Sequence, residues 1–451
     1  MMEGAEMNRE ELKKRVAEEI DRRQDEIIAV ADKIWKHPEL GFKEFGTAEL
    51  VGEEFDRLRL QSRHGLAITG VKAIAEGGQP GPTVAIIGEL DSILVADHPA
   101  ADPTTGAAHC CGHNAQIANL IGAAIGLVGS GVMPELSGRL AFMAVPAEEY
   151  VEIEYRDSLR REGKLEFLGG KGELVRLGEF DDVDMAMMVH TGSKDFSEGV
   201  FGSSTSSNGF IAKSARFIGK AAHAAGAPHR GVNALYAATV AINAINALRE
   251  TFQDEDAVRV HPIISRGGDL VNVIPSDVRV ETYVRGKTVA AIESAAKKVD
   301  RALRAGAMAL GAEVEITTLP GYLPLANDEK MLHLFRENFG RDYAPTAWEL
   351  KGHGAGSTDM GDISHIMPAI HPYANGAVGQ AHGNDWAIVD PYIAHVLPAK
   401  LMALTAIDLL ADGARDAKGI LDGYKPRMTK TEYLEFMRRV FAHETYDGSA
   451  E

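Results

Sequence analysis

The stretch AAHCCGHNAQIANLIGAA (residues 107–124) joins a cluster of histidines and cysteines to a run of small residues that predicts a helix over 115–128. An apolar segment precedes it, GPTVAIIGELDSI (81–93), and this segment is typical of a buried strand that ends in Glu89 and Asp91. A buried strand followed by a helix is the building unit of an α/β sheet. The stretch therefore predicts an α/β domain with polar side chains where strand and helix meet.

Two further apolar segments predict strands of the same sheet. GRLAFMAVPAEE (138–149) ends in two adjacent acids, and VDMAMMVHTG (183–192) is expected to end in His190. Open α/β sheets place their active sites at the carboxyl ends of the strands, so these polar residues are candidate site residues. Residues 8–36 carry apolar residues at helical spacing and predict one amphipathic helix.

The pattern changes between residues 207 and 319. GFIAKSARFIGKAAH (209–223) alternates like an exposed antiparallel strand, and 261–286 predicts two strands around a Pro-Ser-Asp turn. Two helical segments, 233–250 and 287–311, accompany them. Two helices on one antiparallel sheet predict a compact α+β domain inserted into the α/β domain.

The expected organisation is an α/β catalytic domain, with a mixed sheet flanked by helices, that a smaller α+β lid interrupts. The boundaries are 1–206 for the first catalytic part, 207–319 for the lid, 320–411 for the second catalytic part and 412–451 for a helical tail. Thr429 and Glu432 fit a capping box at the start of a helix in the tail.

Composition excludes several classes of protein. The net charge of -18 argues against non-specific binding to nucleic acid. No apolar run reaches the roughly 18 residues that suggest a membrane span, and the charged N-terminal segment does not resemble a secretory signal. We therefore expect a cytoplasmic protein that binds neither nucleic acid nor membrane.

The two cysteines, Cys110 and Cys111, are adjacent. Neighbouring Cα atoms are only about 3.8 Å apart, short of disulfide geometry, and the spacing is not that of a Cys-x-x-Cys redox motif. A buried packing role and a metal-ligand role remain open for each of them.

Side chains suited to a transition metal occur at the predicted strand ends and in loops. Gly112 separates Cys111 from His113 and permits the sharp turn that would let both converge. Each residue alone has an ordinary structural explanation, but together thiolate, imidazoles and carboxylates suit Zn²⁺ and tolerate Mn²⁺ or Co²⁺. The pattern indicates a metallohydrolase, with candidate ligands Cys111, His113, Glu148, Glu149, His190 and His382.

Seven motifs occur in order along the chain: IWKHPELGFKEFGTAELV (34–51), HCCGHN (109–114), VPAEE (145–149), VH (189–190), GKAAHAAGAPHRGVNAL (219–235), GGDLVNVIPSDVRV (267–280) and STDMGDISHIMPAIHPY (357–373). Together they resemble the hippuricase and auxin-conjugate amidohydrolase branch of the aminoacylase/carboxypeptidase metallopeptidase family. CGHN together with the last motif most resembles the aminobenzoyl-glutamate utilisation members of that branch. The resemblance covers roughly residues 10–410.

The resemblance implies a site for two divalent metal ions, Mn or Zn, and a lid domain that also dimerises. Glu148 would be the general base, and His223 would stabilise the oxyanion, reaching the site of a partner subunit. Asn272 and Arg285 would bind substrate, and a role in lid packing is the alternative for His223 and Asn272. Glu89 and Asp91 would orient the ligands. The implied ligands are Cys111, His113, Glu149, His190 and His382, with Cys111 bridging.

Some features depart from the family pattern. Asn114 and Gln116 replace an acid and a second histidine, and Cys110 replaces a small residue. Glu149 and His190 are 41 residues apart, which indicates an insertion beside the site. Either the insertion is a surface excursion or it contacts an aromatic or anionic substrate, with candidates Tyr150, Tyr155, Arg156 and Arg160.

The leading hypothesis is hydrolysis of a C–N bond in a small molecule with aromatic and carboxylate groups: the amide of an N-acyl amino acid, aminobenzoyl-glutamate or a dipeptide. One alternative is hydrolytic deamination of an aromatic amine, like that of nitroanthranilate aminohydrolases, which releases ammonia. Another is a non-catalytic metal-binding protein on the same scaffold. A homodimer through the lid, or a higher homo-oligomer, is expected.

Overall fold

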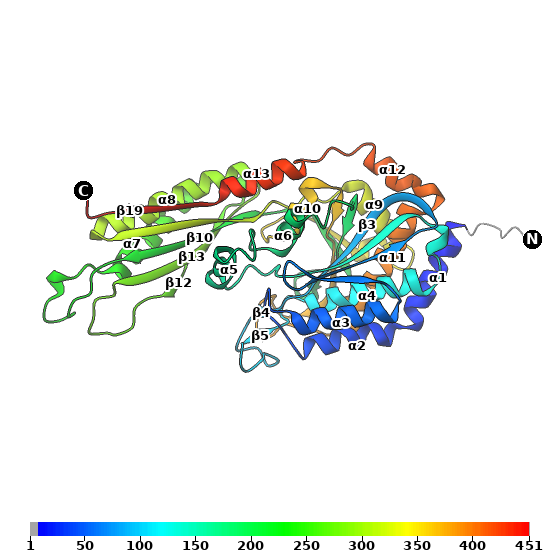
Figure 1. The fold of residues 1–451 in the computed structure, drawn as a ribbon, viewed down its shortest axis with the longest axis horizontal. Helices are drawn as coiled ribbons and strands as arrows, with labels where there is room; N and C mark the ends of the chain where they lie inside the picture. Colours follow the sequence, from blue (N-terminus) through cyan, green and yellow to red (C-terminus); the bar gives the residue numbers. More distant parts are fainter. Residues whose placement is uncertain (1–7, 451) are drawn as a thin grey trace, which may run out of the picture. The chain divides into compact units, whose positions relative to one another are not determined.

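The computed structural model describes residues 8–450, which divide into two units (Figure 1). The first comprises residues 8–205, 326–352 and 362–427, and the second comprises residues 206–325, 353–361 and 428–450. The second unit contains the whole range expected for the lid. It also takes in the end of the segment expected to form a separate tail.

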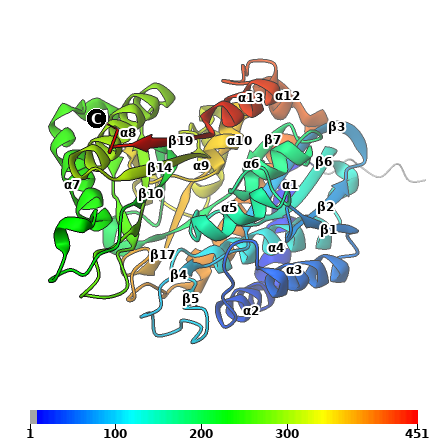
Figure 2. The same ribbon diagram turned by 60° about the vertical axis from the view of Figure 1, so that its left-hand side comes forward.

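The first unit is built on a six-stranded mixed sheet, which confirms the α/β class. Figure 2 shows β3, β6, β2 and β1 side by side, and β7 and β16 continue the sheet beyond β3. The four strands β6, β3, β7 and β16 are parallel, whereas β2 pairs antiparallel with β6, and β1 pairs antiparallel with β2. The strands in order are β1 (Ser62–Leu66), β2 (Gly70–Glu76), β6 (Ser137–Val145), β3 (Gln79–Glu89), β7 (Met185–Met187) and β16 (Ala369–Ile370).

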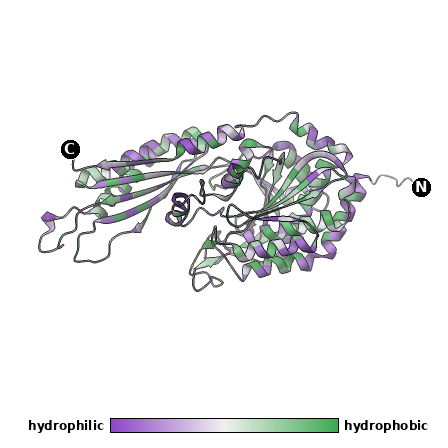
Figure 3. Ribbon diagram, in the orientation of Figure 1, coloured by the Kyte–Doolittle hydropathy of each residue, from purple (hydrophilic) through white to green (hydrophobic). Residues whose placement is uncertain are grey.

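Helices cover this sheet in two layers. Helices α4 and α11 contact β3 and β6, and α1 and α2 pack on α4. Charged and apolar residues interleave along the outer helices, which Figure 3 shows as alternating purple and green turns. The helices are α1 (Arg9–Arg22), α2 (Gln24–Trp35), α3 (Phe45–Arg57), α4 (His113–Gly129), α9 (Glu329–Phe339), α10 (Met360–Ile366), α11 (Leu397–Leu410) and α12 (Arg415–Leu421).

The prediction of a single helix over 8–36 is wrong in one respect, because the helix is interrupted at Arg23, which separates α1 from α2. The break lets Ile20 and Ile27 both reach the small-residue face of α4. A Cβ on the α4 glycines opposite them would lie only 2.6 and 3.0 Å from these two side chains. The small residues of the opening stretch therefore set how closely α1 and α2 approach α4.

The segment Tyr392–Leu410 is long and apolar enough to span a membrane by length and composition, and 94% of its most apolar window is buried within the protein. It forms a π-helical turn and α11, which lie in the core of the first unit. Its apolar composition is explained by that position.

A second, smaller sheet carries part of the candidate site. The third predicted strand, 183–192, is in fact two strands: β7 stays in the main sheet, and β8 (His190–Ser193) pairs with β17. His190 therefore begins a strand rather than ending one. The strands here are β8, β9 (Phe201–Ser207), β15 (Trp348–Gly354), β17 (Tyr373–Val378) and β18 (Ala387–Ile388), and a separate hairpin pairs β4 (Ile93–Leu94) with β5 (Ala107–Ala108).

The second unit is an antiparallel sheet with two helices. Helices α7 (Ala234–Ala247) and α8 (Val289–Leu310) share one apolar core with the sheet. Strand β10, expected to be exposed, is mostly buried because β13 and β14 pair along both of its edges. The strands are β10 (Gly209–Ile218), β11 (Arg259–Val260), β12 (Ile263–Arg266), β13 (Asp277–Gly286), β14 (Glu313–Tyr322) and β19 (Ala442–Asp447).

The C-terminal segment does not form a separate tail. Helix α13 (Lys430–Val440) begins with the predicted capping box of Thr429 and Glu432, which confirms that prediction. Strand β19 then pairs with β14 from Glu313 opposite Asp447 to Thr318 opposite Ala442. The end of the chain thus covers one edge of the sheet of the second unit.

Candidate metal centre

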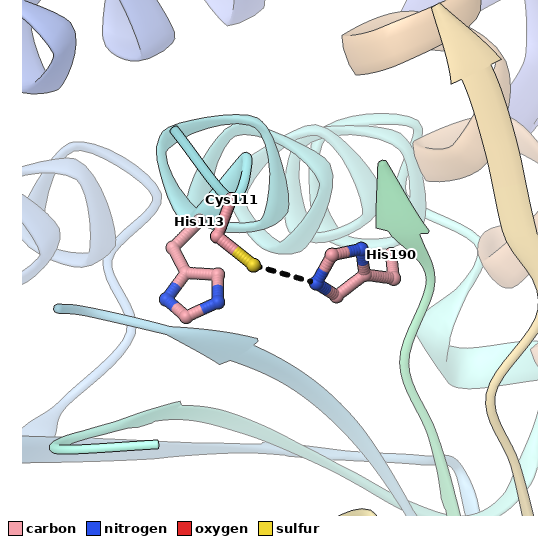
Figure 4. Close-up of side chains that lie close together, drawn as sticks. All are labelled: Cys111, His113 and His190. Atoms are coloured by element: carbon pink, nitrogen blue, oxygen red, sulfur yellow. Dashed lines mark hydrogen bonds between the residues drawn. The ribbon is translucent and has the colours of Figure 1, made fainter. Parts of the chain in front are cut away.

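The first unit brings together all five implied ligands and Glu148. Cys111 Sγ lies 3.4 Å from Nε2 of His190 and 3.4 Å from Nε2 of His382. His382 Nε2 lies 3.0 Å from Oε1 of Glu149. Figure 4 shows the Cys111 thiol between the rings of His113 and His190. Side chains from four separate segments of the chain therefore converge on one place.

These side chains form two groups of metal-ligand size that share one member. One group is Cys111, His113 and His190, and the other is Cys111, Glu149 and His382. Within each group the ligand atoms lie within 4.8 Å of one another. A sulfur common to both groups is the arrangement that a bridging ligand between two cations requires. A third group of the same size comprises Glu89, His113 and Glu148.

Gly112 determines how the opening stretch places Cys111 and His113. It is the N-cap of α4 and has φ 91°, in the left-handed region that favours glycine. A Cβ at this position would lie 2.7 Å from the Cβ of Thr191, beside His190. The glycine thus makes the sharp turn and also admits the neighbouring strand.

The loop of residues 146–149 presents the two acids after β6 ends at Val145. Ala147 has φ 55°, a left-handed conformation that is unfavourable for a residue with a side chain. Its N–H donates to Oε1 of Glu44 at 2.8 Å, and the N–H of Glu149 donates to Oδ2 of Asp91 at 2.9 Å. Buried carboxylates therefore hold the backbone on both sides of Glu148.

Backbone oxygens fix the orientation of two imidazoles. His113 Nδ1 lies 2.9 Å from the Asp91 carbonyl oxygen and 3.1 Å from its carboxylate, and His190 Nδ1 lies 2.8 Å from the Thr191 carbonyl oxygen. A protonated Nδ1 in these contacts leaves Nε2 of each ring as the free electron-pair donor. Both Nε2 atoms lie on the side where Cys111 lies.

Glu89 is held beside the centre by a buried network. Its Oε1 accepts from Nζ of Lys171 at 2.6 Å, and its Oε2 accepts from Nε2 of Gln116 at 2.7 Å. Oε2 also lies 3.1 Å from Nε2 of His113. Gln116, which departs from the family pattern, thus supplies a neutral amide donor to this carboxylate.

The electrostatics distinguish the two cysteines. Burial and the Glu149 carboxylate raise the pKa of Cys111, but in the metal-free protein the positive charges of protonated His190, His382 and His113 outweigh them and bring the pKa down to about 6. Burial and the neighbouring Cys111 raise the pKa of Cys110 to about 12. At neutral pH, Cys111 is therefore a thiolate, the form that binds metals, whereas Cys110 is a buried thiol.

The residues present fit a divalent metal. Nε2 of His113 and Oε1 of Glu149 are buried, and among residues 8–450 their neighbours at 3.1 and 3.0 Å, Oε2 of Glu89 and Nε2 of His382, do not complete a hydrogen bond of good geometry. Buried polar atoms without a well-formed hydrogen bond are costly, and a bound cation would satisfy both of these electron-pair donors. The donor set of one thiolate, three imidazoles and a carboxylate suits Zn²⁺ or Mn²⁺. The His382 side chain is 48% exposed, so this side of the centre is open to solvent.

Three predicted residues lie in the second unit. Nδ1 of His223 accepts hydrogen bonds from the N–H groups of Ala225 and Gly226, at 3.3 and 3.1 Å. His223 also forms a backbone bridge with Val273, next to Asn272, so these two candidates lie close together. Arg285 lies elsewhere, on β13.

The guanidinium of Arg285 covers two aromatic rings of its own unit. It lies 5.8 Å from the ring centroid of Phe210 and 5.4 Å from that of Tyr283. Cation–π attraction to these two rings restricts the orientation of the Arg285 side chain.

The insertion after Glu149 is folded into helices, and the residues expected to contact substrate there are largely engaged within the protein. It forms α5 (Ile153–Arg161) and leads into α6 (Gly170–Leu177). Arg156, a candidate for substrate contact, is fully buried and bonds to backbone carbonyls, so that expectation is wrong. Tyr150 is buried as well, with its ring 5.9 Å from the Arg156 guanidinium, and Arg160 bonds to Asp157.

Sequence reasoning missed two residues that shape the centre. Glu44 belongs to the 34–51 motif, so its position in a shared motif could have indicated a role near the site. Lys171 carried no signal, because a lysine in a helix is ordinarily a solvated side chain.

Comparison with known proteins identifies relatives over most of the chain. Residues 205–309 match the M20 peptidase dimerisation domain. A Xaa-Arg dipeptidase of Mus musculus is 28% identical over 443 residues, covering 94% of each chain. One component of the p-aminobenzoyl-glutamate hydrolase of Escherichia coli is 29% identical over 323 residues, covering 69% of this chain and 62% of that one.

Solved structures share the fold. A dinuclear metal-binding peptidase of the M20 family from Bacillus subtilis superposes with a TM-score of 0.62 at 20% identity, covering 86% of this chain and 99% of that one. At this identity the likeness concerns the fold, and it extends over both units described above.

Proposed function

We propose that this chain, a member of the M20 peptidase and amidohydrolase family, is a binuclear metal-dependent hydrolase. It would cleave the amide bond of an N-acyl amino acid or a dipeptide-like substrate. The observation that carries the proposal is the position of Cys111, whose thiolate belongs to both groups of metal-ligand size. A structural site does not need a shared thiolate with an acid such as Glu148 beside it, so the geometry favours catalysis.

Cys111, His113 and His190 would hold one cation, and Cys111, Glu149 and His382 would hold the other. Two bound divalent ions, Mn²⁺ or Zn²⁺, supply polarisation of the substrate carbonyl and a water of lowered pKa. The exposed edge at His382 is where substrate and water would enter.

Glu148 is the proposed general base. Its Oε2 lies 3.9 Å from Nε2 of His113, and it belongs to neither of the two groups that share Cys111. The carboxylate takes a proton from the attacking water and delivers it to the leaving nitrogen, a role that contributes about 10²–10⁴-fold in enzymes. Asp91 supports this step, because it fixes both the ring of His113 and the N–H of Glu149.

The proposed substrate carries an aromatic acyl group and a carboxylate. Support for the aromatic acyl group comes from a relative whose name specifies aminobenzoyl-glutamate hydrolysis, and a relative named Xaa-Arg dipeptidase supports an amide next to a free carboxylate. In the second unit, His223 and Asn272 offer donors for a carbonyl oxyanion, and Arg285 offers a cation for a carboxylate.

We also propose a homodimer through the second unit. The match to a dimerisation domain covers most of its segment 206–325, and apolar side chains are exposed on α7 and β12: Tyr236, Val240, Ile263 and Ile264. The opposite edge of this sheet is covered by β19. A surface of this kind commonly marks a protein interface.

The test is a substrate screen with two readouts. Protein reconstituted with Mn²⁺ or Zn²⁺ is incubated with N-acyl aromatic amino acids, aminobenzoyl-glutamate, dipeptides and aminobenzoates, and free amino acid and ammonia are measured separately. We expect amino acid without ammonia. Ammonia alone would overturn amide hydrolysis in favour of deamination.

Glu148→Gln is the matching variant. It keeps the shape of the side chain and removes its basicity, so metal content should be retained while kcat falls by about 10²-fold or more. A Glu148→Gln protein with its metal and full activity would contradict the mechanism.

A further inference from the structure

We propose that Arg156 is a positioning residue that fixes the backbone of the loop 146–149 and thereby the carboxylates of Glu148 and Glu149. Arg156 belongs to the insertion that distinguishes this chain from the usual family pattern. The inference rests on the proposed function only for the catalytic use of these two acids. The geometry of the loop is independent of any substrate.

The guanidinium of Arg156 joins the loop 146–149, at two of its residues, to the segment at Leu168. Nη1 donates to the carbonyl oxygen of Ala147 at 3.1 Å and to that of Leu168 at 2.9 Å. Nη2 donates to the carbonyl oxygen of Glu149. One side chain therefore connects the beginning of the loop, its end and the far end of the insertion.

The loop needs such support because its conformation is unfavourable. The left-handed backbone of Ala147 is stable only where its surroundings determine it. Glu44 and Asp91 accept the N–H groups of Ala147 and Glu149, and Arg156 donates to the carbonyl oxygens of the same two residues. The N–H group and the carbonyl group of Ala147, and those of Glu149, are thus all hydrogen-bonded to buried side chains on either side of Glu148.

The charge of Arg156 argues that it is more than packing. Its side chain is 0% exposed, and no carboxylate between residues 8 and 450 forms an ion pair with it. Its other neighbours are the rings of Phe42 and Tyr150, at 5.3 and 5.9 Å from the guanidinium carbon. Burying a cation without an anion is costly, and an apolar side chain would fill the same space without that cost.

The planar fork explains why the residue is arginine. Its donors diverge in one plane and reach oxygens of three residues, whereas the ammonium of lysine is a compact point charge. Gly41 provides the space for this fork. A Cβ there would lie 2.3 Å from Nη2 of Arg156 and 3.0 Å from Cα of Ala147.

The first test is Arg156→Met, which keeps the length of the side chain and removes all three hydrogen bonds. Residues that orient metal ligands typically change metal affinity or activity by about 10–100-fold, and we expect a loss of this size in Co²⁺ affinity and in kcat. KM should change less than kcat, because the residues proposed to bind substrate, His223, Asn272 and Arg285, lie in the second unit. Co²⁺ affinity is measured by titration of the metal-free protein, from the thiolate-to-cobalt absorption.

Arg161→Met is the matched control. Arg161 lies on the same helix, its side chain is 65% exposed, and it pairs with Asp157. It should bind Co²⁺ like the unaltered chain. Arg156→Lys should recover only part of the affinity lost in Arg156→Met.

Gly41→Ala tests the same contact from the opposite side. The new methyl group should displace the guanidinium and reproduce the loss of Co²⁺ affinity. Combined with Arg156→Met, its effect should be less than the sum of the two single losses, because the contact with the guanidinium is gone and only the contact with Ala147 remains. This variant also serves if Arg156→Met fails to fold.

The proposal is overturned if folded Arg156→Met, or Gly41→Ala, binds Co²⁺ and turns over substrate like the Arg161→Met control. It is also overturned if the effects of the two variants simply add. The Co²⁺ titrations need no substrate. If the unaltered protein hydrolyses no amide, the proposed function fails while the positioning role of Arg156 is still decided.

Discussion

Gly112→Ala should destabilise the metal-free protein more than an equivalent change at a glycine in open space. The left-handed backbone at φ 91° costs a residue with a side chain about 1–2 kcal/mol. The added methyl group would also lie 2.7 Å from the Cβ of Thr191, and overpacking of this kind costs about 1–3 kcal/mol. The two effects together predict a loss of about 2–5 kcal/mol in the free energy of unfolding.

Gly413→Ala separates the two contributions. Gly413 has φ 71°, and no atom of residues 8–450 lies within 4 Å of the position that its Cβ would take. It should therefore show only the backbone cost of about 1–2 kcal/mol. The assay is urea denaturation of the metal-free proteins, compared by the midpoint and slope of the transition.

The same pair of variants should differ in metal binding. Movement of Gly112 away from Thr191 displaces Cys111 and His113 relative to His190, so Gly112→Ala should bind Zn²⁺ more weakly than Gly413→Ala. Equal unfolding free energies for the two variants would refute the argument from close approach. Equal Zn²⁺ affinities would refute its link to the metal centre.

Three further predictions concern other parts of the chain. Cys111→Ser should lower the content of both metals, measured by elemental analysis, because both groups share its sulfur, whereas Cys110→Ala should retain both; retention of two metals by Cys111→Ser would contradict a shared thiolate. Burial and Asp91 raise the pKa of Glu44 from 4.5 to about 7, so the folded state holds this proton more tightly. That stabilisation is complete below about pH 4.5 and is lost as pH rises through 7, a decline of up to about 3 kcal/mol that metal-free Glu44→Gln should lack in denaturation at pH 5 and pH 8. Ending the chain at Val440 keeps α13, removes β19 and exposes the edge of β14, so light scattering should detect association beyond that of the full chain. An unchanged mass would argue that β19 is not a protective strand.

Local pattern was sufficient for much of the fold. The strand before Glu89, the small-residue helix after His113 and the capping box at Thr429 depend on spacing within a few residues, and each occurs in the structure. The one helix expected over 8–36 failed because its break depends on contacts with α4, which are distant in sequence. The strand expected to end in His190 failed for the same reason, since β8 exists only where β17 pairs with it.

The candidate site shows the same division. The sequence by itself determined which residue types are available: a thiolate and an imidazole separated by one glycine, two adjacent acids after a strand, and a histidine in a glycine-rich loop. Only the tertiary structure decided that Cys111 belongs to two groups at once and that Cys110 does not titrate near neutral pH. It also turned Arg156 from a candidate substrate contact into a buried support for the loop that carries Glu148. The reason is physical: spacing along the chain fixes local conformation, whereas burial, charge and ligand geometry depend on which distant segments pack around a side chain.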